Sequence, residues 1–430
     1  MEQIRVLVFP CGSEIGLELF RSLKDIRFVT LYGASSVDDH GKWVYERYIG
    51  GLPYVTEPGL IDSLNACVDE HRIDYIFPAM DSVMLALSEH RHELHATLLT
   101  SPEETVRVCR SKAATYEKLK ECAFMPKTFP DADSVTEYPV LVKPAVGQGS
   151  QGVMKVEDAE ALCQLLAECD EEQVICEYLP GEEYTVDCFT DRHGLLRYCK
   201  ARVRCRVRNG ISVSTWTIDD RPEVRAIAEE INGRLPFRGV WFFQLKRDRE
   251  GTLKLLECAT RVAGTMCADR ALGVNLPLLT VMDAMGLDVL IEPQAGGVEV
   301  DRALDSVYRL DLDYDELYMD FDDTLIVHGR VNRDALSLIY QCVERDIPVT
   351  LLTRHEGDIH ADLRGARICE ALFARVVEVG KGQKKSACVH PGRKALVIDD
   401  SFAERRDMAE AFGVPALGVE SIEALLDHHQ

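Results

Sequence analysis

The chain has 430 residues, of which 46% are hydrophobic and 28% are charged, a mixture typical of globular proteins rather than disordered or fibrous ones. At about 150 residues per domain, this length predicts roughly three domains. The chain has 49 Lys and Arg residues and 72 Asp and Glu residues, so its net charge is -23. This negative charge argues against a general binder of nucleic acid or anionic membranes.

The cysteines and the lack of long apolar runs indicate where the protein works. Fifteen cysteines lie at scattered spacings without a CxxC pair, which is typical of reduced thiols and argues against a cysteine-held metal. No apolar run approaches the ~20 residues that span a bilayer, and the start of the chain lacks the layout of a signal peptide. We therefore expect a cytoplasmic protein with no membrane and no nucleic-acid partner.

The first segment, residues 1–110, predicts a Rossmann-like layer, because apolar strand-like runs alternate with helical stretches. A buried strand over residues 6–9 leads into a glycine-containing turn and a helix over residues 11–23. Such a turn can hold an anion, but the full dinucleotide pattern is missing, which favours a plain tight turn. A strand over residues 74–78 ends before Asp81, where strand tips of open sheets meet ligands.

The second segment, residues 111–300, carries a candidate phosphate loop. A strand over residues 138–144 contains Lys143, which would reach the phosphates as a point charge. A glycine-rich loop follows, whose N–H groups can approach phosphate oxygens closely. The alternative is a simple hairpin turn. The loop residues expected at the phosphates are Gly147, Gly149, Ser150 and Gly152.

Two further patterns in this segment suit a nucleotide and a metal. Residues 174–187 read as strand, turn and strand, so the backbone of Tyr178 and Leu179 would read an adenine edge and Glu183 would accept hydrogen bonds from a ribose. Residues 239–244 and 255–261 read as antiparallel strands. Their pairing would bring Gln244 and Glu257 together as oxygen ligands for Mg²⁺.

In this order the motifs resemble the ATP-grasp superfamily, especially carboxylate–amine ligases similar to the synthetase domains of carbamoyl-phosphate synthase, over residues 1 to about 290. The resemblance implies a Rossmann-like pre-ATP-grasp domain and an ATP-grasp fold of α+β type. It also implies ATP with Mg²⁺, or Mn²⁺, as cofactors, and a carboxylate that is phosphorylated by ATP before an amine displaces the phosphate. The residues it assigns are Lys112 and Lys143 with the glycine loop at the phosphates, Glu177 and Glu183 at the adenosine, Gln244 and Glu257 at the metal, and Arg261 in catalysis.

One departure from the superfamily concerns the metal strand. The usual pattern is Glu-x-Asn-x-Arg, whereas this chain has Ala259 between Glu257 and Arg261. A metal would then be held less completely, with water at the position of the Asn side chain. A weakened or redirected ATPase is the alternative, and the retention of Glu257 and Arg261 favours an active site.

Arginines alternate with apolar residues over residues 202–208. In a strand this alternation would place all four arginines on one face, where they repel one another unless an anion lies between them. We expect Arg202 and Arg204 to bind the substrate or the triphosphate, while Arg206 and Arg208 face solvent. The alternatives are a solvated sheet edge or pairing with nearby acids.

A glycine-containing stretch over residues 293–297 is the predicted linker to the third segment, residues 312–430. A DxDxT sequence with Asp320 and Asp322 follows an apolar strand there. A capped helix start is the alternative for that sequence, and the three motifs that follow argue against it. Those motifs are Thr353 at a strand end, Lys384 and Lys385 before a short helix, and Asp399 and Asp400 at the end of another strand.

This ordered set resembles the haloacid-dehalogenase-like (HAD) phosphatase superfamily over about residues 314–425. The resemblance implies a Rossmann-like domain, and the spacing of about thirty residues between motifs leaves no room for a separate cap. Its implied roles are an aspartyl-phosphate nucleophile for Asp320, a general acid/base for Asp322, phosphoryl binding for Thr353 and a lysine, preferably Lys385, and Mg²⁺ binding for Asp320, Asp322, Asp399 and Asp400. Clustered carboxylates require such a cation.

Together the motifs predict an α/β bifunctional enzyme, an ATP-dependent carboxylate–amine ligase joined to a Mg²⁺-dependent phosphatase. The expected partners are a small-molecule carboxylate, an amine and a phosphoester. We hypothesise that both sites act on a common metabolite. The alternatives are a kinase without ligation and a nucleotide-sensing domain that regulates the phosphatase; the oligomeric state is left open, a homo-oligomer included.

Overall fold

The computed structural model describes residues 2–147, 149, 151–208, 210–294, 296–308, 310–392 and 394–427. The chain forms two compact units, of which unit 1 ends at Leu304 and unit 2 begins at Asp305. Among the described residues, no helix combines the length and the apolar character that crossing a bilayer requires.

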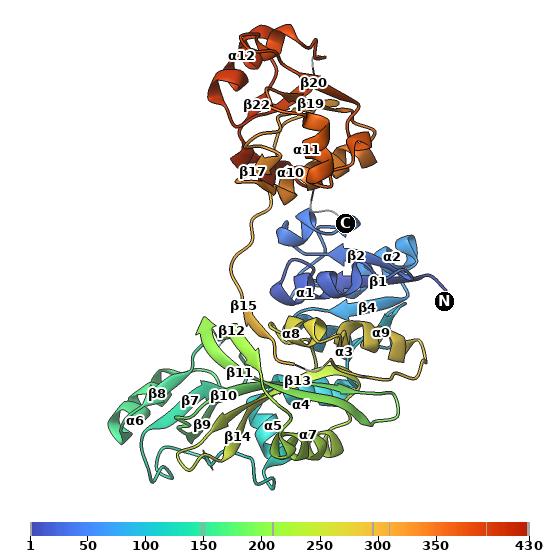
Figure 1. Ribbon diagram of the computed structural model, residues 1–430. Helices are drawn as coiled ribbons and strands as arrows, with labels where there is room; N and C mark the ends of the chain where they lie inside the picture. The colour runs from blue at the N-terminus through green and yellow to red at the C-terminus, as the bar shows by residue number, and fades with distance from the viewer. Residues whose placement is uncertain are drawn as a thin grey trace. The chain divides into compact units, whose positions relative to one another are not determined.

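Unit 1 begins with a parallel five-stranded sheet in the order β3-β2-β1-β4-β5 (Figure 1). Helices cover both of its faces, because the side chains of β1 alternate between a cluster with α1 and α9 and a cluster with α2 and α3. The predicted strands over residues 6–9 and 74–78 and the predicted helix after the glycine turn are confirmed as β1, β4 and α1. The strands are β1 (Ile4–Phe9), β2 (Val29–Ala34), β3 (Tyr48–Ile49), β4 (Tyr75–Pro78) and β5 (Thr97–Leu98). The helices are α1 (Glu14–Leu23), η1 (His40–Trp43), α2 (Leu60–His71) and α3 (Asp81–Glu89), with α8 (Cys267–Ala271) and α9 (Leu276–Ala284) from later in the chain.

A six-stranded antiparallel sheet forms the second layer of unit 1, in the order β14-β13-β10-β11-β12-β15. One face packs against α5 and α7, with the fully buried Trp241 stacked on Phe237 at a centroid distance of 3.9 Å. The strands are β10 (Glu183–Thr190), β11 (Leu196–Arg208), β12 (Ile211–Thr217), β13 (Gly239–Arg247), β14 (Leu253–Ala259) and β15 (Glu299–Asp301). The helices nearby are α4 (Glu103–Arg110), α5 (Lys112–Leu119) and α7 (Pro222–Arg234).

A smaller antiparallel sheet of four strands, in the order β6-β9-β7-β8, carries the predicted lysine strand and the predicted glycine loop (Figure 1). Its apolar side chains pack against α6. The strands are β6 (Thr128–Phe129), β7 (Val140–Pro144), β8 (Met154–Val156) and β9 (Gln173–Glu177), and the helix is α6 (Ala159–Glu168).

The end of unit 1 is an edge strand. β15 pairs with β12, and Arg206 holds Asp301 through two hydrogen bonds of 2.9 and 3.0 Å. One residue further on, Nη1 of Arg302 lies 3.2 Å from Glu14 at the start of α1. The chain before Leu304 is therefore tied to the six-stranded sheet and to helix α1.

Unit 2 is built on a parallel five-stranded sheet in the order β20-β19-β16-β21-β22. α10 and α11 pack on one face and α12 on the other. The predicted strands before the DxDxT sequence, before Thr353 and before Asp399 are confirmed as β16, β19 and β21. The strands are β16 (Glu316–Met319), β17 (Ile326–Val327), β18 (Arg330–Val331), β19 (Val349–Thr353), β20 (Arg375–Glu378), β21 (Ala395–Ile398) and β22 (Ala416–Leu417). The helices are α10 (Arg333–Glu344), α11 (Ile359–Gly365), η2 (Glu370–Leu372), η3 (Lys385–Ala387), α12 (Phe402–Phe412) and η4 (Val419–Leu425).

Candidate functional site

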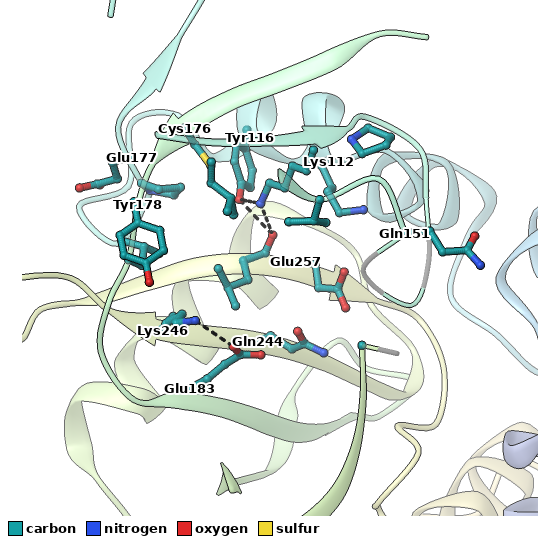
Figure 2. A pocket seen from close by; sticks show the side chains of 18 of the residues that line it. Lys112, Tyr116, Gln151, Cys176, Glu177, Tyr178, Glu183, Gln244, Lys246 and Glu257 are labelled. Atoms are coloured by element: carbon teal, nitrogen blue, oxygen red, sulfur yellow. Dashed lines mark hydrogen bonds and ion pairs between the residues drawn. The ribbon is translucent and has the colours of Figure 1, made fainter. Parts of the chain in front are cut away.

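A cavity of about 230 Å³ is lined by residues from the four-stranded sheet, α5 and the six-stranded sheet (Figure 2). It collects most of the residues that the sequence assigned to a nucleotide. Those that line it are Lys112, Lys143, Gly149, Glu177, Tyr178, Leu179, Glu183, Arg204, Gln244 and Glu257. Ser150 lies outside the described residues, and Gly147 lines a small adjoining cavity with Arg261.

The predicted lysine strand aims its lysine into the interior. The Nζ of Lys143 donates to the hydroxyl of Tyr116 at 2.5 Å and to the backbone oxygen of Leu256 at 3.3 Å. Burial opposes the charge of Lys143, but the neighbouring Tyr116, Cys176 and Glu257 outweigh it, so the pKa of Lys143 is raised. The raised pKa favours the protonated form of this lysine.

Gly152 ends the loop for a steric reason. Its φ is +70°, and a Cβ at this position would lie 2.8 Å from Cγ of Pro144. The residue belongs to the predicted loop but not to the lining of the cavity. Gly152 thus allows the loop to turn beside Pro144, and its predicted place at the phosphates stays a prediction.

The predicted pairing of Gln244 with Glu257 is confirmed. These residues face each other in the register of β13 and β14, and both side chains border the cavity (Figure 2). An amide oxygen and a carboxylate side by side are the oxygen ligands that Mg²⁺ prefers. The donor set on this side of the cavity thus fits a hard divalent cation.

Glu183 is engaged on both oxygens. Oε1 lies 2.9 Å from Nε of Arg204 and Oε2 lies 3.3 Å from Nζ of Lys246 (Figure 2). Sequence reasoning missed Lys246, although strand alternation places it on the same face as Gln244, two residues earlier. It also missed Tyr116, which lies one helical turn after Lys112 in α5.

Glu177 has a structural contact as well as a place in the cavity. Its Oε1 accepts a hydrogen bond of 2.7 Å from the backbone N–H of Lys127. This contact fixes the strand end next to Tyr178 and Leu179. The predicted role of Glu177 at an adenosine remains open to test.

The expectation of a single arginine face is wrong. Irregular pairing between β11 and β12 on both sides of Arg206 interrupts the alternation, so Val207 lines the same cavity wall as Arg202 and Arg204. Arg206 instead pairs with Asp301 at the sheet edge. Only 1% of Arg202 is exposed, and its Nε lies 2.9 Å from Asp187.

Arg261 forms a two-pronged ion pair with Asp81. The Nε and Nη2 atoms lie 2.6 and 2.9 Å from the two carboxylate oxygens. Burial opposes ionisation of Asp81, but the guanidinium outweighs it and lowers the pKa of that carboxyl. Asp81, the predicted acid after a strand end, and Arg261, the predicted catalytic arginine, thus form one ion pair. This pair links the segment that follows β4 to the segment that follows β14.

Unit 2 has a separate carboxylate cluster. Ligand atoms of Asp320, Asp399 and Asp400 lie within 4.8 Å of one another. Nζ of Lys385 lies 2.6 Å from both Asp320 and Asp399. Burial, opposed by Lys385, raises the pKa of Asp320 to about 6. Such a group of carboxylates fits a divalent cation.

The two candidate lysines differ sharply. The side chain of Lys385 is 2% exposed within the cluster, whereas that of Lys384 is 76% exposed and pairs with Asp407 at 3.0 Å. Thr353 is fully buried at the end of β19, as its place in the sequence predicts.

Asp322, expected in the metal set, lies outside the cluster of three carboxylates. Its carboxylate lies 2.9 Å from Nδ1 of His355, whose Nε2 lies 2.6 Å from Asp362. Sequence reasoning missed His355, two residues after Thr353. Burial opposes protonation of His355, but hydrogen bonds to Asp322 and Asp362 raise its pKa.

Comparison with known families identifies one segment of unit 1. Residues 169–303 match a family model described as "ATP-grasp in the biosynthetic pathway with Ter operon". Among curated proteins, no match is found.

Similarity to solved structures identifies the fold of the chain. Biotin carboxylase from Campylobacter jejuni, in a β-γ-ATP complex, is similar with a TM-score of 0.57 and 15% identity over 69% of this chain and 74% of that chain. N5-carboxyaminoimidazole synthetase from Staphylococcus aureus, complexed with ADP, has a TM-score of 0.54 and 14% identity over 67% and 79%. L-amino acid ligase from Bacillus licheniformis has a TM-score of 0.52 and 18% identity over 66% and 74%. The chain thus contains a mixed α/β, ATP-grasp-like fold.

Proposed function

We propose, on the premise of this ATP-grasp-like fold, that unit 1 is a cytoplasmic ATP-dependent carboxylate–amine ligase that works through an acyl phosphate. The observation that carries the proposal is the single cavity lined by Lys112 and Lys143 together with Gln244 and Glu257. Cationic side chains and oxygen ligands for a metal in one cavity suit a metal triphosphate. The solved relatives that carry ADP or β-γ-ATP support this choice of ligand.

Each residue has a role in this proposal. When bound, MgATP supplies the phosphoryl group, and the two lysines hold its oxygens as charge builds up during transfer. Gln244 and Glu257 hold the cation, or Mn²⁺ in its place. Tyr178 and Leu179 border the base, and Arg204 with Lys246 orients Glu183 toward the ribose. We assign residues 1–110 to the pre-ATP-grasp part and residues 111–300 to the ATP-grasp part.

ADP release tests the ligase proposal. Purified protein is incubated with ATP, Mg²⁺, a panel of carboxylic acids and hydroxylamine as the amine. We expect acid-dependent ADP release together with hydroxamate formation, because hydroxylamine intercepts an acyl phosphate. ADP release that does not depend on any amine would favour a kinase, and binding of ATP without turnover would favour a nucleotide sensor. Ala259, in place of the usual Asn, is the observation that favours the latter alternative.

We propose that unit 2, with residues 312–430, is a Mg²⁺-dependent phosphomonoester phosphatase of the HAD type. Its support is the cluster in which Asp320, Asp399 and Asp400 could share a cation beside Lys385. Asp320 would attack phosphorus, Asp322 would transfer the proton, and Thr353 with Lys385 would hold phosphoryl oxygens. Mass spectrometry of the products of both activities would test a shared metabolite; the absence of any common compound would count against it.

Arg204→Ala is expected to raise the KM for ATP about tenfold or more, because Arg204 holds the carboxylate of Glu183 at 2.9 Å beside the cavity. Arg206→Ala is the matched control, since Arg206 pairs with Asp301 at the sheet edge and does not line the cavity. Steady-state kinetics with varied ATP measures both variants. Equal KM values in Arg204→Ala and the natural protein would remove Arg204 from the site.

Mg²⁺ is expected to raise the thermal midpoint of unit 2 more at about pH 7.5 than at about pH 5. In the folded protein the pKa of Asp320 is about 6 against 3.8 for a free carboxyl. The free energy of unfolding therefore falls as the pH rises from about 3.8 to about 6, the loss is complete above that pH, and a bound cation relieves this cost. Calorimetry with Mg²⁺ and with a chelator measures the shift; an Mg²⁺ effect that is the same at both pH values would contradict the assignment.

A further inference from the structure

Three buried side chains at the wall of a second cavity each have a polar atom without a hydrogen-bond partner in the part of the chain that the structure describes. The exposed fractions of Thr185, Arg202 and Thr265 are 2%, 1% and 1%. Among the described residues, neither threonine hydroxyl has a hydrogen-bond partner, and neither does Nη1 of Arg202. All three residues line a cavity of about 1000 Å³. Because buried polar groups in folded proteins are normally hydrogen-bonded, these groups indicate a ligand.

The acidic neighbour Asp187 pairs with other atoms of the Arg202 guanidinium and leaves Nη1 without a partner within the described ranges. Its Oδ2 lies 2.9 Å from Nε of Arg202, and its Oδ1 accepts a hydrogen bond of 3.2 Å from Nη2. Burial, and next the charge of Asp187, raise the pKa of Asp269 well above its usual value. Neither acid lines the cavity. Among the residues that the structure describes, the groups left without a partner at the cavity wall are therefore Nη1 of Arg202 and the hydroxyls of Thr185 and Thr265, all of which can donate a hydrogen bond.

The rest of the described cavity lining does not supply hydrogen-bond acceptors for these donors. Of its three acidic residues, Glu14 and Asp81 are already paired, with Arg302 and Arg261, and the third is the candidate metal ligand Glu257. Met80, the cap residue of α3, lines the cavity, and no side chain caps that helix end. Its first N–H groups thus add to the donors. The remaining surface includes the apolar side chains of Ile15, Val207, Ile211 and Phe242.

Strand register sets a distance within this cavity. Arg202, Thr185, Gln244 and Glu257 are direct neighbours in turn across β11, β10, β13 and β14. Neighbouring strands are about 4.8 Å apart, so Thr185 lies two spacings, roughly 10 Å, from Glu257. Gln244 and Glu257 line both cavities, which therefore meet at the candidate metal ligands.

We propose that the larger cavity binds the acceptor acid through a second anionic group, a carboxylate or a phosphate, held by Thr185, Arg202 and Thr265. This inference rests on the proposed ligase function and names the class of its substrate. The reacting carboxylate lies at Gln244 and Glu257, and the second group lies roughly 10 Å away, two strand spacings along the row. Carboxylates and phosphates only accept hydrogen bonds, which matches a wall of unused donors. Apolar side chains suit the spacer between the two ends.

Binding of simple acids by the full-length protein tests the proposal. Isothermal titration calorimetry without nucleotide compares octanedioate and ω-phosphonooctanoate with octanoate, which lacks the second anionic group. We expect the two-headed acids to bind about tenfold tighter or more, because a hydrogen bond to a charged group is lost with octanoate. The tighter of the two identifies the second group as carboxylate or phosphate.

Isosteric variants locate the subsite. Thr185→Val and Thr265→Val each remove one hydroxyl and are expected to weaken octanedioate binding about tenfold while leaving octanoate binding unchanged. Thr215→Val is the control, because Thr215 is fully buried in β12 but outside the cavity. Circular dichroism verifies that each variant is folded.

Equal affinities for octanedioate and octanoate, or unchanged octanedioate binding in both cavity variants, would overturn the proposal. ADP release scores the ligase function separately. Tight binding of two-headed acids without any nucleotide binding would contradict the ligase function and support the cavity assignment. ATP turnover with no preference for such acids would support the ligase function and contradict the cavity assignment.

Discussion

Replacing Asp320 by Asn is expected to lower the kcat of phosphomonoester hydrolysis at least about 10³-fold. An amide cannot form the aspartyl phosphate. It also removes one charge from the cluster with Asp399 and Asp400 that would hold the cation. Hydrolysis of p-nitrophenyl phosphate by the full-length protein, with Mg²⁺ in excess, measures the effect.

Asp313→Asn is the matched control for this prediction. Asp313 is exposed and pairs with Lys394 at 2.5 Å, so its replacement is expected to leave hydrolysis unchanged. Binding of ATP is expected to survive in both variants, because neither residue belongs to unit 1. Full activity in Asp320→Asn would rule out this residue as the nucleophile.

Glu257→Gln is expected to lower ATP turnover about 10³-fold while ATP still binds. The carboxylate of Glu257 faces Gln244 across β13 and β14, and the substitution removes the negative ligand but keeps the shape of the side chain. Lys112 and Lys143 remain to hold the phosphates. ADP release and calorimetric titration with a non-hydrolysable ATP analogue separate the loss of turnover from the loss of binding.

Glu250→Gln provides the comparison, since Glu250 lies exposed between β13 and β14 and away from both cavities. It is expected to turn over ATP at the natural rate. If Glu257→Gln keeps the natural rate as well, the metal-site assignment fails.

Local patterns were enough to predict the elements that carry the two sites. The apolar run before Lys143, the paired strands around the turn at residues 247–251, and the runs before Asp320, Thr353 and Asp399 all form strands. Each is short, apolar and followed by polar residues, which is the pattern that burial in a sheet imposes. The same patterns correctly placed Gln244 opposite Glu257.

Contacts between distant segments could not be predicted in the same way. The pair of Asp81 with Arg261 joins residues 180 positions apart, and no local pattern encodes it. The bulges around Arg206 arise from how β11 and β12 pair, so a strict alternation of arginines in the sequence predicted a continuous face that the strand does not have. Likewise, the sequence of β11 alone does not predict that Asp187 of β10 is the ion-pair partner of Arg202.

The edge strand β15 has a consequence for anyone who wishes to study the two activities apart. A chain cut before residue 299 would lose a strand and leave the backbone of β12 unpaired, which invites aggregation through that exposed edge. It would also release Arg206 and Glu14 from Asp301 and Arg302. A soluble N-terminal half should therefore extend to Leu304, and a failed assay on a shorter piece would report a damaged sheet rather than an inactive ligase.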